Sequence, residues 1–307
     1  MKKAALLLAL LVIAACFCWY IFDPDLTNHR VGYQSDQIQT LRPETTIHHN
    51  DGTAKPAARV TSGAIESSKA NVISEEIPIP DGWTLVWQDE FDAPQLSMEY
   101  WTEIDRKDNF NGELQYYTTA NSYIEDGCLV LTAKEEAKED KKYTSGMVQT
   151  WDKVEMLYGR IEARISLPVA QGIFPAFWMT NNGDHHELDI LEMVGCEPGN
   201  IYGVCHYWKH NRLVKTYGML HIDNAEAFHV YALEWDETEV RWYIDGQEFF
   251  NTIRGVPAED MYILLNLAVG GEWPGSPDNT TEFPIRMKVD YVRVFQREPQ
   301  GGSNDLT

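Results

Sequence analysis

Between residues 77 and 297 the chain is a succession of short segments rich in β-branched and aromatic residues, without sustained helical periodicity. Such segments predict β-strands, here at 128–133, 158–166, 230–235, 240–244 and 287–295. Asp-Gly pairs at 126–127 and 245–246 separate some of them and are typical of tight turns between antiparallel strands. Short strands at this spacing predict an all-β sandwich or barrel of antiparallel sheets, and about 220 residues suffice for one large sandwich.

The first 22 residues have the features of an export or anchoring segment. Two lysines follow Met1, and the apolar run from Ala4 to Ala15 has the length of a signal-peptide core. Ile13-Ala-Ala-Cys16 resembles a bacterial lipoprotein cleavage box, in which the cysteine becomes the lipidated first residue. The run read on to Phe22 would just span a bilayer, whereas plain cleavage would release the chain. A lipoprotein at Cys16, a membrane-anchored chain and a secreted or periplasmic protein therefore remain open, and all three are exported.

Residues 23–76 have a different composition, with one aromatic residue, Tyr33, and many small polar side chains. Such a stretch buries too little apolar area to offset its ordering entropy, so we expect a disordered linker. The folded domain is expected at 77–297, because nine of the ten tryptophans lie between Trp83 and Trp273. Residues 298–307 are expected to form a polar tail.

The formal net charge is −22, from 47 acidic and 25 basic residues. Nucleic acid is excluded as a partner, because phosphate binding needs clustered cations. An acidic polymer is disfavoured for the same reason, since no local basic patch is evident. A neutral partner fits best, and membrane contact is expected only through the N-terminal segment.

The five cysteines are too few and too scattered for a disulfide framework, and no pair has the spacing of a zinc site. Cys196 and Cys205 flank the turn at Pro198-Gly-Asn200 symmetrically, so they could face each other across a hairpin. Export would permit a disulfide there, and the sequence leaves open whether one forms. Cys128 lies in an apolar strand and is expected to be a buried thiol.

The strongest functional signal is His185-His-Glu-Leu-Asp-Ile-Leu-Glu192, where three carboxylates fall within six residues of an otherwise apolar run. Side chains alternate between the faces of a strand, so Glu187 and Asp189 share a face. Glu192 would point to the opposite face of a regular strand. One bulge at Ile190-Leu191 would bring all three acids to the same face, and bulges are common beside active sites.

Three neighbouring acids repel each other, which raises one pKa and creates a carboxylic acid beside a carboxylate. Glycoside hydrolysis needs such a pair as proton donor and nucleophile. On a concave strand Glu187 and Glu192 could converge to about 5–5.5 Å, the separation found in retaining enzymes. A solvated acidic face and a metal site with His185 and His186 are the alternatives. The zinc-protease pattern H-E-x-x-H is not met, because residue 190 is Ile.

Glu187-Leu-Asp-Ile-Leu-Glu192 resembles the active-site signature of glycoside hydrolase family sixteen in its bulged, laminarinase-like form, that of endo-β-1,3-glucanases. The resemblance extends over nearly all of residues 83–296. Further matching segments follow in order at 87–92, 111–118, 158–164, 172–179, 228–235, 266–274 and 289–293. The resemblance implies a concanavalin A-like β-jelly roll of two curved antiparallel sheets, with the cleft on the concave face.

The resemblance implies that Glu187 is the nucleophile and Glu192 the general acid/base, with Asp189 between them hydrogen-bonding the nucleophile. The implied reaction is endo-cleavage of a neutral β-glucan with retention, without a catalytic cofactor, by a monomer. We expect β-1,3 linkages, while mixed-linkage glucan or another exopolysaccharide stays open. A non-catalytic glycan-binding sandwich and a transglycosylase of the same fold are the rival functions.

Substrate-binding residues are also implied by the resemblance. Sugar rings present flat apolar faces and hydroxyl groups, so aromatic platforms and polar side chains suit them. The family positions are Asn111, Glu162, Arg164, Trp178, His206, Asn266 and Trp273. Trp235 and Trp242 lie in regular strands and are expected in the core. The chain departs from the laminarinase pattern at Phe174, where Trp is usual, and at Glu272, where Asn is usual.

Many members of the family that this chain resembles hold a structural calcium ion away from the cleft. The matching positions here are Glu90, the carbonyl group of Gly127, and Asp290. Oxygen ligands suit a hard cation. A salt bridge or hydrogen bond at the sheet edge is the alternative use of these groups.

Overall fold

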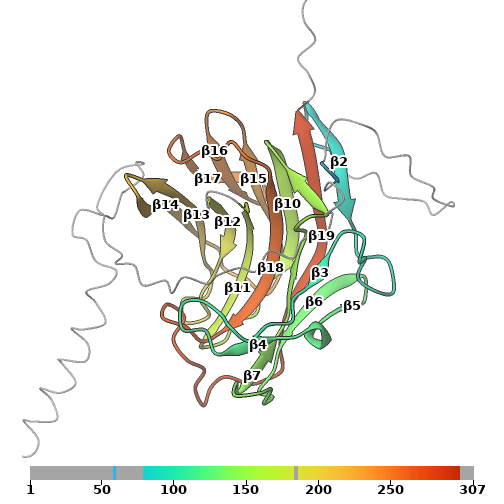
Figure 1. Cartoon of the computed structure of the whole chain (residues 1–307), viewed down its shortest axis with the longest axis vertical. Helices are drawn as coiled ribbons and strands as arrows, with labels where there is room; N and C mark the ends of the chain where they lie inside the picture. The colour runs from blue at the N-terminus through green and yellow to red at the C-terminus, as the bar shows by residue number, and fades with distance from the viewer. Residues whose placement is uncertain (1–57, 60–78, 183–185, 298–307) are drawn as a thin grey trace, which may run out of the picture. The chain divides into compact units, whose positions relative to one another are not determined.

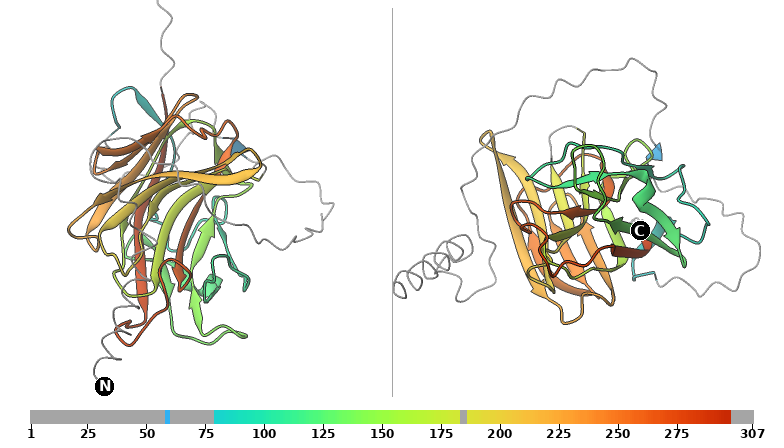
Figure 2. Two further views of the ribbon diagram at one scale, coloured as in Figure 1. Left: turned by 90° about the vertical axis from the view of Figure 1, so that its left-hand side faces the viewer. Right: turned by 90° about the horizontal axis from the view of Figure 1, so that it is seen from below.

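Two largely antiparallel sheets pack face to face, as the sequence predicted (Figure 1). The computed structural model describes residues 58–59, 79–182 and 186–297. Figure 2 shows the same sheets from two further directions, with strands that curve along their length. The architecture therefore agrees with a curved jelly-roll sandwich.

The front sheet has nine strands. They are β1 (Ala58–Arg59), β3 (Thr102–Glu103), β8 (Met147–Gln149), β9 (Val154–Met156), β11 (Ile173–Thr180), β12 (Glu187–Glu192), β13 (Asn200–Lys209), β14 (Arg212–His221) and β18 (Met261–Val269). The order is β1-β9-β18-β11-β12-β13-β14, with β8 attached to β18 and β3 to β8. Strand β12, which contains the three acids, therefore lies inside the sheet, and β14 is an edge strand.

The back sheet has eight strands. They are β2 (Trp83–Asp89), β5 (Ser122–Glu125), β6 (Cys128–Ala133), β10 (Gly159–Ser166), β15 (Phe228–Trp235), β16 (Val240–Ile244), β17 (Gln247–Thr252) and β19 (Ile285–Arg297). The order is β17-β16-β15-β10-β19-β6-β5, and β2 pairs with β19. A small parallel pair, β4 (Gln115–Tyr117) and β7 (Tyr143–Ser145), and the 3-10 helix η1 (Thr119–Asn121) complete the elements.

The predicted strands reappear as β6, β10, β15, β16 and β19. Both predicted Asp-Gly turns are two-residue hairpin loops, one between β5 and β6 and the other between β16 and β17. Asp126 and Gly127 have φ values of 53° and 72°, and Asp245 and Gly246 have 49° and 79°. Positive φ at both positions is the requirement of the type I′ turn, which Asp-Gly meets at low cost.

The core lies between the sheets and includes Trp235 and Trp242, as expected, at 2% and 0% exposure. The Trp242 indole Nε1 donates a hydrogen bond of 2.8 Å to the main-chain carbonyl of Asp189. Gly203 on β13 makes room for this ring, because a Cβ there would lie 2.5 Å from Trp242 Cδ1. The back sheet is thereby fastened to the middle of β12.

The calcium site stays a prediction, and the structure shows what its two carboxylates contact. Both oxygens of Glu90 accept hydrogen bonds from Arg293, at 2.8 and 2.9 Å. Asp290 accepts one from Arg164 at 2.7 Å. Each carboxylate is already neutralised by a guanidinium group, so a cation bound here would have to displace both arginines. The alternative reading, a salt bridge in place of an ion, fits these residues on the back sheet.

Cys196 and Cys205 are free thiols, so the disulfide left open by the sequence is not formed. Cys205 is fully buried, and its thiol donates to the main-chain carbonyl of Gly255 at 3.4 Å. Cys196 is exposed. The two side chains differ in this way because Cys205 points from β13 into the core. Cys128 is a buried thiol, as predicted.

The predictions for residues 1–22, most of 23–76 and 298–307 lie outside the described residues. Within the expected linker, Ala58–Arg59 pair in parallel with β9. The described part of the chain contains no helix with the length and hydropathy that crossing a bilayer requires.

Gly203→Ala is expected to destabilise the fold, because the added methyl group would overlap the Trp242 ring. Overpacking of this kind costs about 1–3 kcal/mol of the free energy of unfolding. Denaturant unfolding would measure it, with the exposed Arg212→Ala on the adjacent strand as the control. An unchanged unfolding midpoint for Gly203→Ala would contradict the tight contact described here.

Candidate active site

A bulge in β12 brings the three acids to one face of the front sheet. Against β11, Asp189 pairs with Trp178 and Glu192 with Ala176, and the register shifts by one residue between these pairs. The same shift occurs against β13. Leu188, Ile190 and Leu191 are fully buried in the core, so the acids project from the opposite side, here named the acid face. The bulge predicted at Ile190-Leu191 is present.

Burial and mutual repulsion raise the pKa values of two of the three acids. Burial, then the charges of Glu192 and Glu187, raise the pKa of Asp189 well above its ordinary value. Asp189 Oδ2 has no hydrogen-bond partner among the described residues to offset this desolvation. Burial, followed by the charge of Glu187, raises the pKa of Glu192 to about 8. At neutral pH Glu192 is therefore a proton donor.

The Glu187 side chain is more open to solvent, at 35% exposure against 5% for Asp189. A solvent-exposed acid and an acid with a pKa of about 8 thus lie at the two ends of the bulged strand, with the buried Asp189 between them. Lys215 on β14 opposes part of the pKa rise at Asp189 and Glu192. The sequence reasoning missed this lysine, because only the pairing of His206 with Lys215 across β13 and β14 brings it to the acid face.

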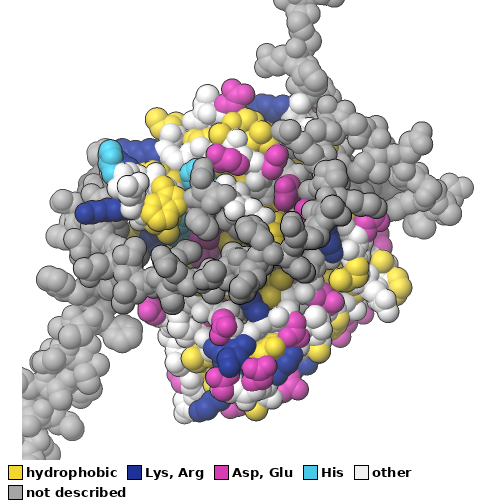
Figure 3. Space-filling view, in the orientation of Figure 1, with side chains coloured by type: hydrophobic (Ala, Val, Ile, Leu, Met, Phe, Trp, Pro, Cys, Tyr) yellow, Lys and Arg dark blue, Asp and Glu magenta, His cyan; other side chains and the backbone are white. Residues whose placement is uncertain are grey.

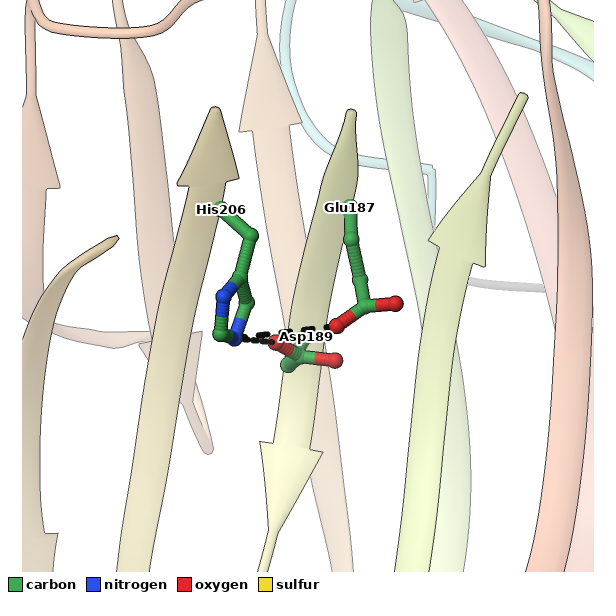
Figure 4. Close-up of side chains that lie close together, drawn as sticks. All are labelled: Glu187, Asp189 and His206. Atoms are coloured by element: carbon green, nitrogen blue, oxygen red, sulfur yellow. Dashed lines mark ion pairs between the residues drawn. The ribbon is translucent and has the colours of Figure 1, made fainter. Parts of the chain in front are cut away.

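His206 reaches over from β13 toward the acids (Figure 4). Its Nε2 lies 3.4 Å from Asp189 Oδ2 and 3.6 Å from Glu187 Oε1. Desolvation, followed by the charge of Lys215, lowers the pKa of His206 to about 3. The imidazole is therefore neutral at neutral pH. Its contacts with the two acids are polar contacts and not ion pairs. The structure thus brings His206, predicted from the sequence as a substrate contact, beside Glu187 and Asp189.

These three side chains also have the donor types of a metal site. One potential ligand atom from each of Glu187, Asp189 and His206 lies within 4.8 Å of the others. Of the two histidines weighed for that role in the sequence, only His186 lies among the described residues, and it is not in this cluster. His186 contacts Glu259, with Nδ1 3.3 Å from Oε2, and His185 lies outside the described residues.

Trp178 and Asn266 form a supporting network on the acid face. The Trp178 indole Nε1 donates to Asn266 Oδ1 at 2.7 Å, and Asn266 Nδ2 donates to the Tyr117 hydroxyl at 3.2 Å. Asn266 is only 7% exposed. Predicted as a substrate contact, Asn266 lies among protein partners and acts here as a positioning residue for Trp178. Trp178 itself stands directly across from Asp189 and remains partly exposed.

Trp273 lies on the acid face near Glu192. Its ring makes edge contacts with Phe174 at 5.4 Å and with Tyr202 at 5.1 Å between centroids. Tyr202 pairs with Glu192 across β12 and β13, and Trp273 is 41% exposed. Phe174, which departs from the family pattern, therefore packs against Trp273, the predicted aromatic platform. The sequence reasoning missed Tyr202, although its spacing of four residues from His206 places both side chains on one face of β13.

Asn111 lies in the loop beside this platform. It is exposed, it has a φ of 54°, and its main-chain carbonyl accepts a hydrogen bond of 2.8 Å from the Glu272 amide. Its side chain is thus available next to Trp273, in agreement with the predicted position.

Glu162 and Arg164 are not part of this site, which corrects their prediction as substrate contacts. Both lie on β10 in the back sheet, where they alternate with core residues and face away from the front sheet. Glu162 accepts a hydrogen bond from Arg160 at 2.8 Å, and Arg164 pairs with Asp290. Alternation correctly placed the two side chains on one face, but it does not say which sheet the strand joins.

Glu192→Gln is expected to stabilise the fold increasingly as pH rises from about 4.5 to about 8. Over that range the unfolded chain has released the Glu192 proton while the folded chain retains it, so wild-type stability falls with pH. The glutamine has no proton to lose. Thermal unfolding across this pH range would measure the difference, with the exposed Glu237→Gln as the control. A difference in midpoint that does not change with pH would contradict the raised pKa.

Comparison with known proteins is consistent with this geometry. A family model described as "Glycosyl hydrolases family 16" matches residues 109–293. A second, "Beta-glucan synthesis-associated protein SKN1/KRE6/Sbg1", matches residues 2–185. A β-glucanase from Rhodothermus marinus is 36% identical over 244 residues, which cover 70% of this chain and 85% of that protein.

Two further relatives agree with the first. Glucan endo-1,3-beta-glucosidase A1 from Niallia circulans is 32% identical over 72% of this chain, although the alignment covers only 39% of that longer protein. The solved structure of the laminarinase catalytic domain from Thermotoga maritima MSB8 is 36% identical, with a TM-score of 0.65 over 71% of this chain and 100% of that domain. The family match and the identity to these relatives show that the chain belongs to glycosyl hydrolase family 16.

Proposed function

We propose that the chain is a retaining endo-β-glucanase that cleaves a neutral β-glucan, with 1,3 linkages as the preferred bond. The observation that supports this most directly is the bulged strand β12, which sets an exposed Glu187 and a protonated Glu192 on one face. The relatives named as a β-glucanase and an endo-1,3-beta-glucosidase support the substrate class.

In the first step the Glu187 carboxylate attacks the anomeric carbon and forms a glycosyl-enzyme ester. The Glu192 carboxylic acid gives its proton to the departing glycosidic oxygen, so the leaving sugar departs as a neutral alcohol. In the second step the Glu192 carboxylate takes a proton from water, and the resulting hydroxyl attacks the same carbon and releases Glu187. Two displacements restore the original stereochemistry.

The other groups of the site control charge and position. The raised pKa of Asp189 favours its neutral form, which limits the negative charge beside the nucleophile Glu187. The lowered pKa of His206 keeps the imidazole beside Glu187 neutral at neutral pH, so this ring adds no positive charge next to the nucleophile. Trp178, held by Asn266, and Trp273, held by Phe174 and Tyr202, offer flat apolar surfaces on either side of the acids.

Two rival functions are tested by product analysis. A non-catalytic glycan-binding sandwich would bind without cleavage, although it would have no use for three mutually repelling acids. A transglycosylase would pass the glycosyl group from Glu187 to an acceptor sugar in place of water. The match to a family named for β-glucan synthesis supports keeping this second option.

Export is proposed together with this activity. The Lys2-Lys3 start, the apolar run and the Ile13-Ala-Ala-Cys16 box support an exported chain, either anchored by a lipid at Cys16, anchored by an N-terminal helix, or released. Each arrangement would bring the domain to polysaccharides outside the cytoplasm.

Wild type is expected to release oligosaccharides from a panel of soluble β-glucans, with the highest rate on β-1,3-linked glucan. Glu187→Gln is expected to lose this activity, because the amide cannot attack as a nucleophile, while glucan binding is retained. Reducing-sugar release, product linkage and product mass would be measured. Binding without cleavage of any glucan by wild type would favour the lectin function, and products longer than the substrate would show transglycosylation.

The value of kcat/KM on glucan is expected to fall as pH rises through about 8, because Glu192 then loses the proton that it donates. Glu192→Gln should reduce the rate by about 10²–10⁴-fold on glucan and should remove this alkaline limb. An aryl glycoside with a good leaving group serves as the control substrate, since it needs little proton donation. A wild-type profile that stays flat to pH 9 would rule out Glu192 as the acid.

A further inference from the structure

The acid face continues past the catalytic strand to the edge of the front sheet. Strand β13 presents Tyr202, Val204, His206 and Trp208 on the acid face, because these residues alternate with the buried Ile201 and Cys205. Their partners on β14 are, in the same order, Met219, Tyr217, Lys215 and Leu213. Side chains of paired residues lie on the same side of a sheet, so these four residues of β14 also face the acid side.

The opposite face of β14 confirms this orientation. Thr216 is 4% exposed, and a Cβ at Gly218 would lie 2.5 Å from Phe250 in the back sheet. Val214 and Leu220 pack against the core. The even-numbered positions of β14 therefore face the back sheet, and the odd-numbered positions face outward.

Four of the outward residues form an exposed apolar surface, here named the edge strip: Trp208, Leu213, Tyr217 and Met219. Their exposures are 44%, 36%, 40% and 47%. In Figure 3 hydrophobic side chains are visible over the region of β13 and β14. Lys215 is the single charged residue among the outward positions of β14 from 213 to 219, so the strip contains no carboxylate. Exposed apolar surfaces of this kind mark interaction sites.

The hairpin fixes the strip in place. His210 and Asn211 form a two-residue loop between Lys209 and Arg212, with φ values of 51° and 61°. Positive φ at both loop positions is the type I′ geometry, which matches the twist of the two strands. The ten-residue strands pair along their full length, so Trp208 and Tyr217 are held by a continuous ladder.

The strip also has a defined place relative to the cleaved bond. Strand β14 lies two strand spacings from β12, which is about 10 Å. It is on the side of β12 opposite to Trp178, because β11 and β13 flank β12. Tyr202, which contacts the Trp273 platform, is the residue that pairs with Met219 at one end of the strip. The exposed apolar surface thus runs from the platform beside Glu192 to the sheet edge without a break in the ladder.

We infer that the edge strip binds the stretch of glucan that extends beyond the sugar units flanking the cleaved bond. A neutral polysaccharide suits it, because flat sugar faces stack on Trp and Tyr and the strip has no carboxylate. This inference rests on the proposed function and adds that the protein prefers long chains to short ones. A strip of this kind contributes affinity and leaves the chemistry at Glu187 and Glu192 unchanged.

The test compares the double variant Trp208→Ala/Tyr217→Ala with wild type on polymeric glucan and on the shortest oligosaccharide that is cleaved. Loss of stacking should lower the ratio of kcat/KM for the polymer to kcat/KM for the oligosaccharide by about three- to tenfold. The change should appear in KM. Trp208→Phe/Tyr217→Phe, which keeps an aromatic ring at each position, should recover most of the loss. Met98→Ala, an exposed apolar side chain before β3, is the matched control.

Binding is measured separately in the Glu187→Gln background by affinity electrophoresis in gels containing β-1,3-glucan. Weaker retardation of the strip variants supports the inference, whether or not wild type cleaves that glucan. The proposed function is tested separately, by the activity of wild type. Equal retardation of all variants overturns the inference. Sedimentation would reveal one further contrary outcome. If wild type is a dimer, the double variant is a monomer and glucan binding is unchanged, the strip is a contact between protein chains.

Discussion

The hydrogen bond from Trp242 to the Asp189 carbonyl is the interaction on which the site depends most. A bulge leaves part of the strand ladder unpaired, and an unpaired buried carbonyl is costly. The indole from the back sheet satisfies that carbonyl at the bulge, while Gly203 leaves the space that the ring needs. The buried Ile190 and Leu191 anchor the extra residue in the core. Sandwich packing and active-site geometry therefore depend on the same contact.

Charge within the site follows from where the sheet buries its polar groups. Three acids and a histidine share a small region, where desolvation raises the pKa values of Asp189 and Glu192 and lowers that of His206. Lys215, the cation whose charge acts on all three of these groups, comes from the edge strand. One exposed carboxylate beside one protonated carboxyl is the state that double displacement requires. In this fold, burial is the main cause of the raised pKa of the proton donor Glu192.

Much of this could be predicted from local sequence. Strand periodicity located β6, β10, β15, β16 and β19, the Asp-Gly pairs located two type I′ turns, and the acid spacing required a bulge at 190–191. Glu162 and Arg164 were wrong as substrate contacts. Strand alternation identifies a face but not a sheet, and the partners of Arg164 and Glu90 are 126 and 203 residues away in the chain. No short-range pattern encodes those ion pairs.

By itself the sequence determined the all-β class, the identity of the three acids and the family to which they belong, because these depend on residue types at short spacing. Only the tertiary structure decided which side chains meet the acids. Lys215 reaches them through a hairpin register, Asn266 turns toward Trp178, and Trp208 and Tyr217 continue the acid face to the sheet edge. A pairing register fixes the contacts of β13 and β14, and the bond between Trp178 and Asn266 joins strands whose residues are 88 positions apart in the chain. Burial then sets the protonation states, since desolvation is a property of the packed site and not of any residue in it.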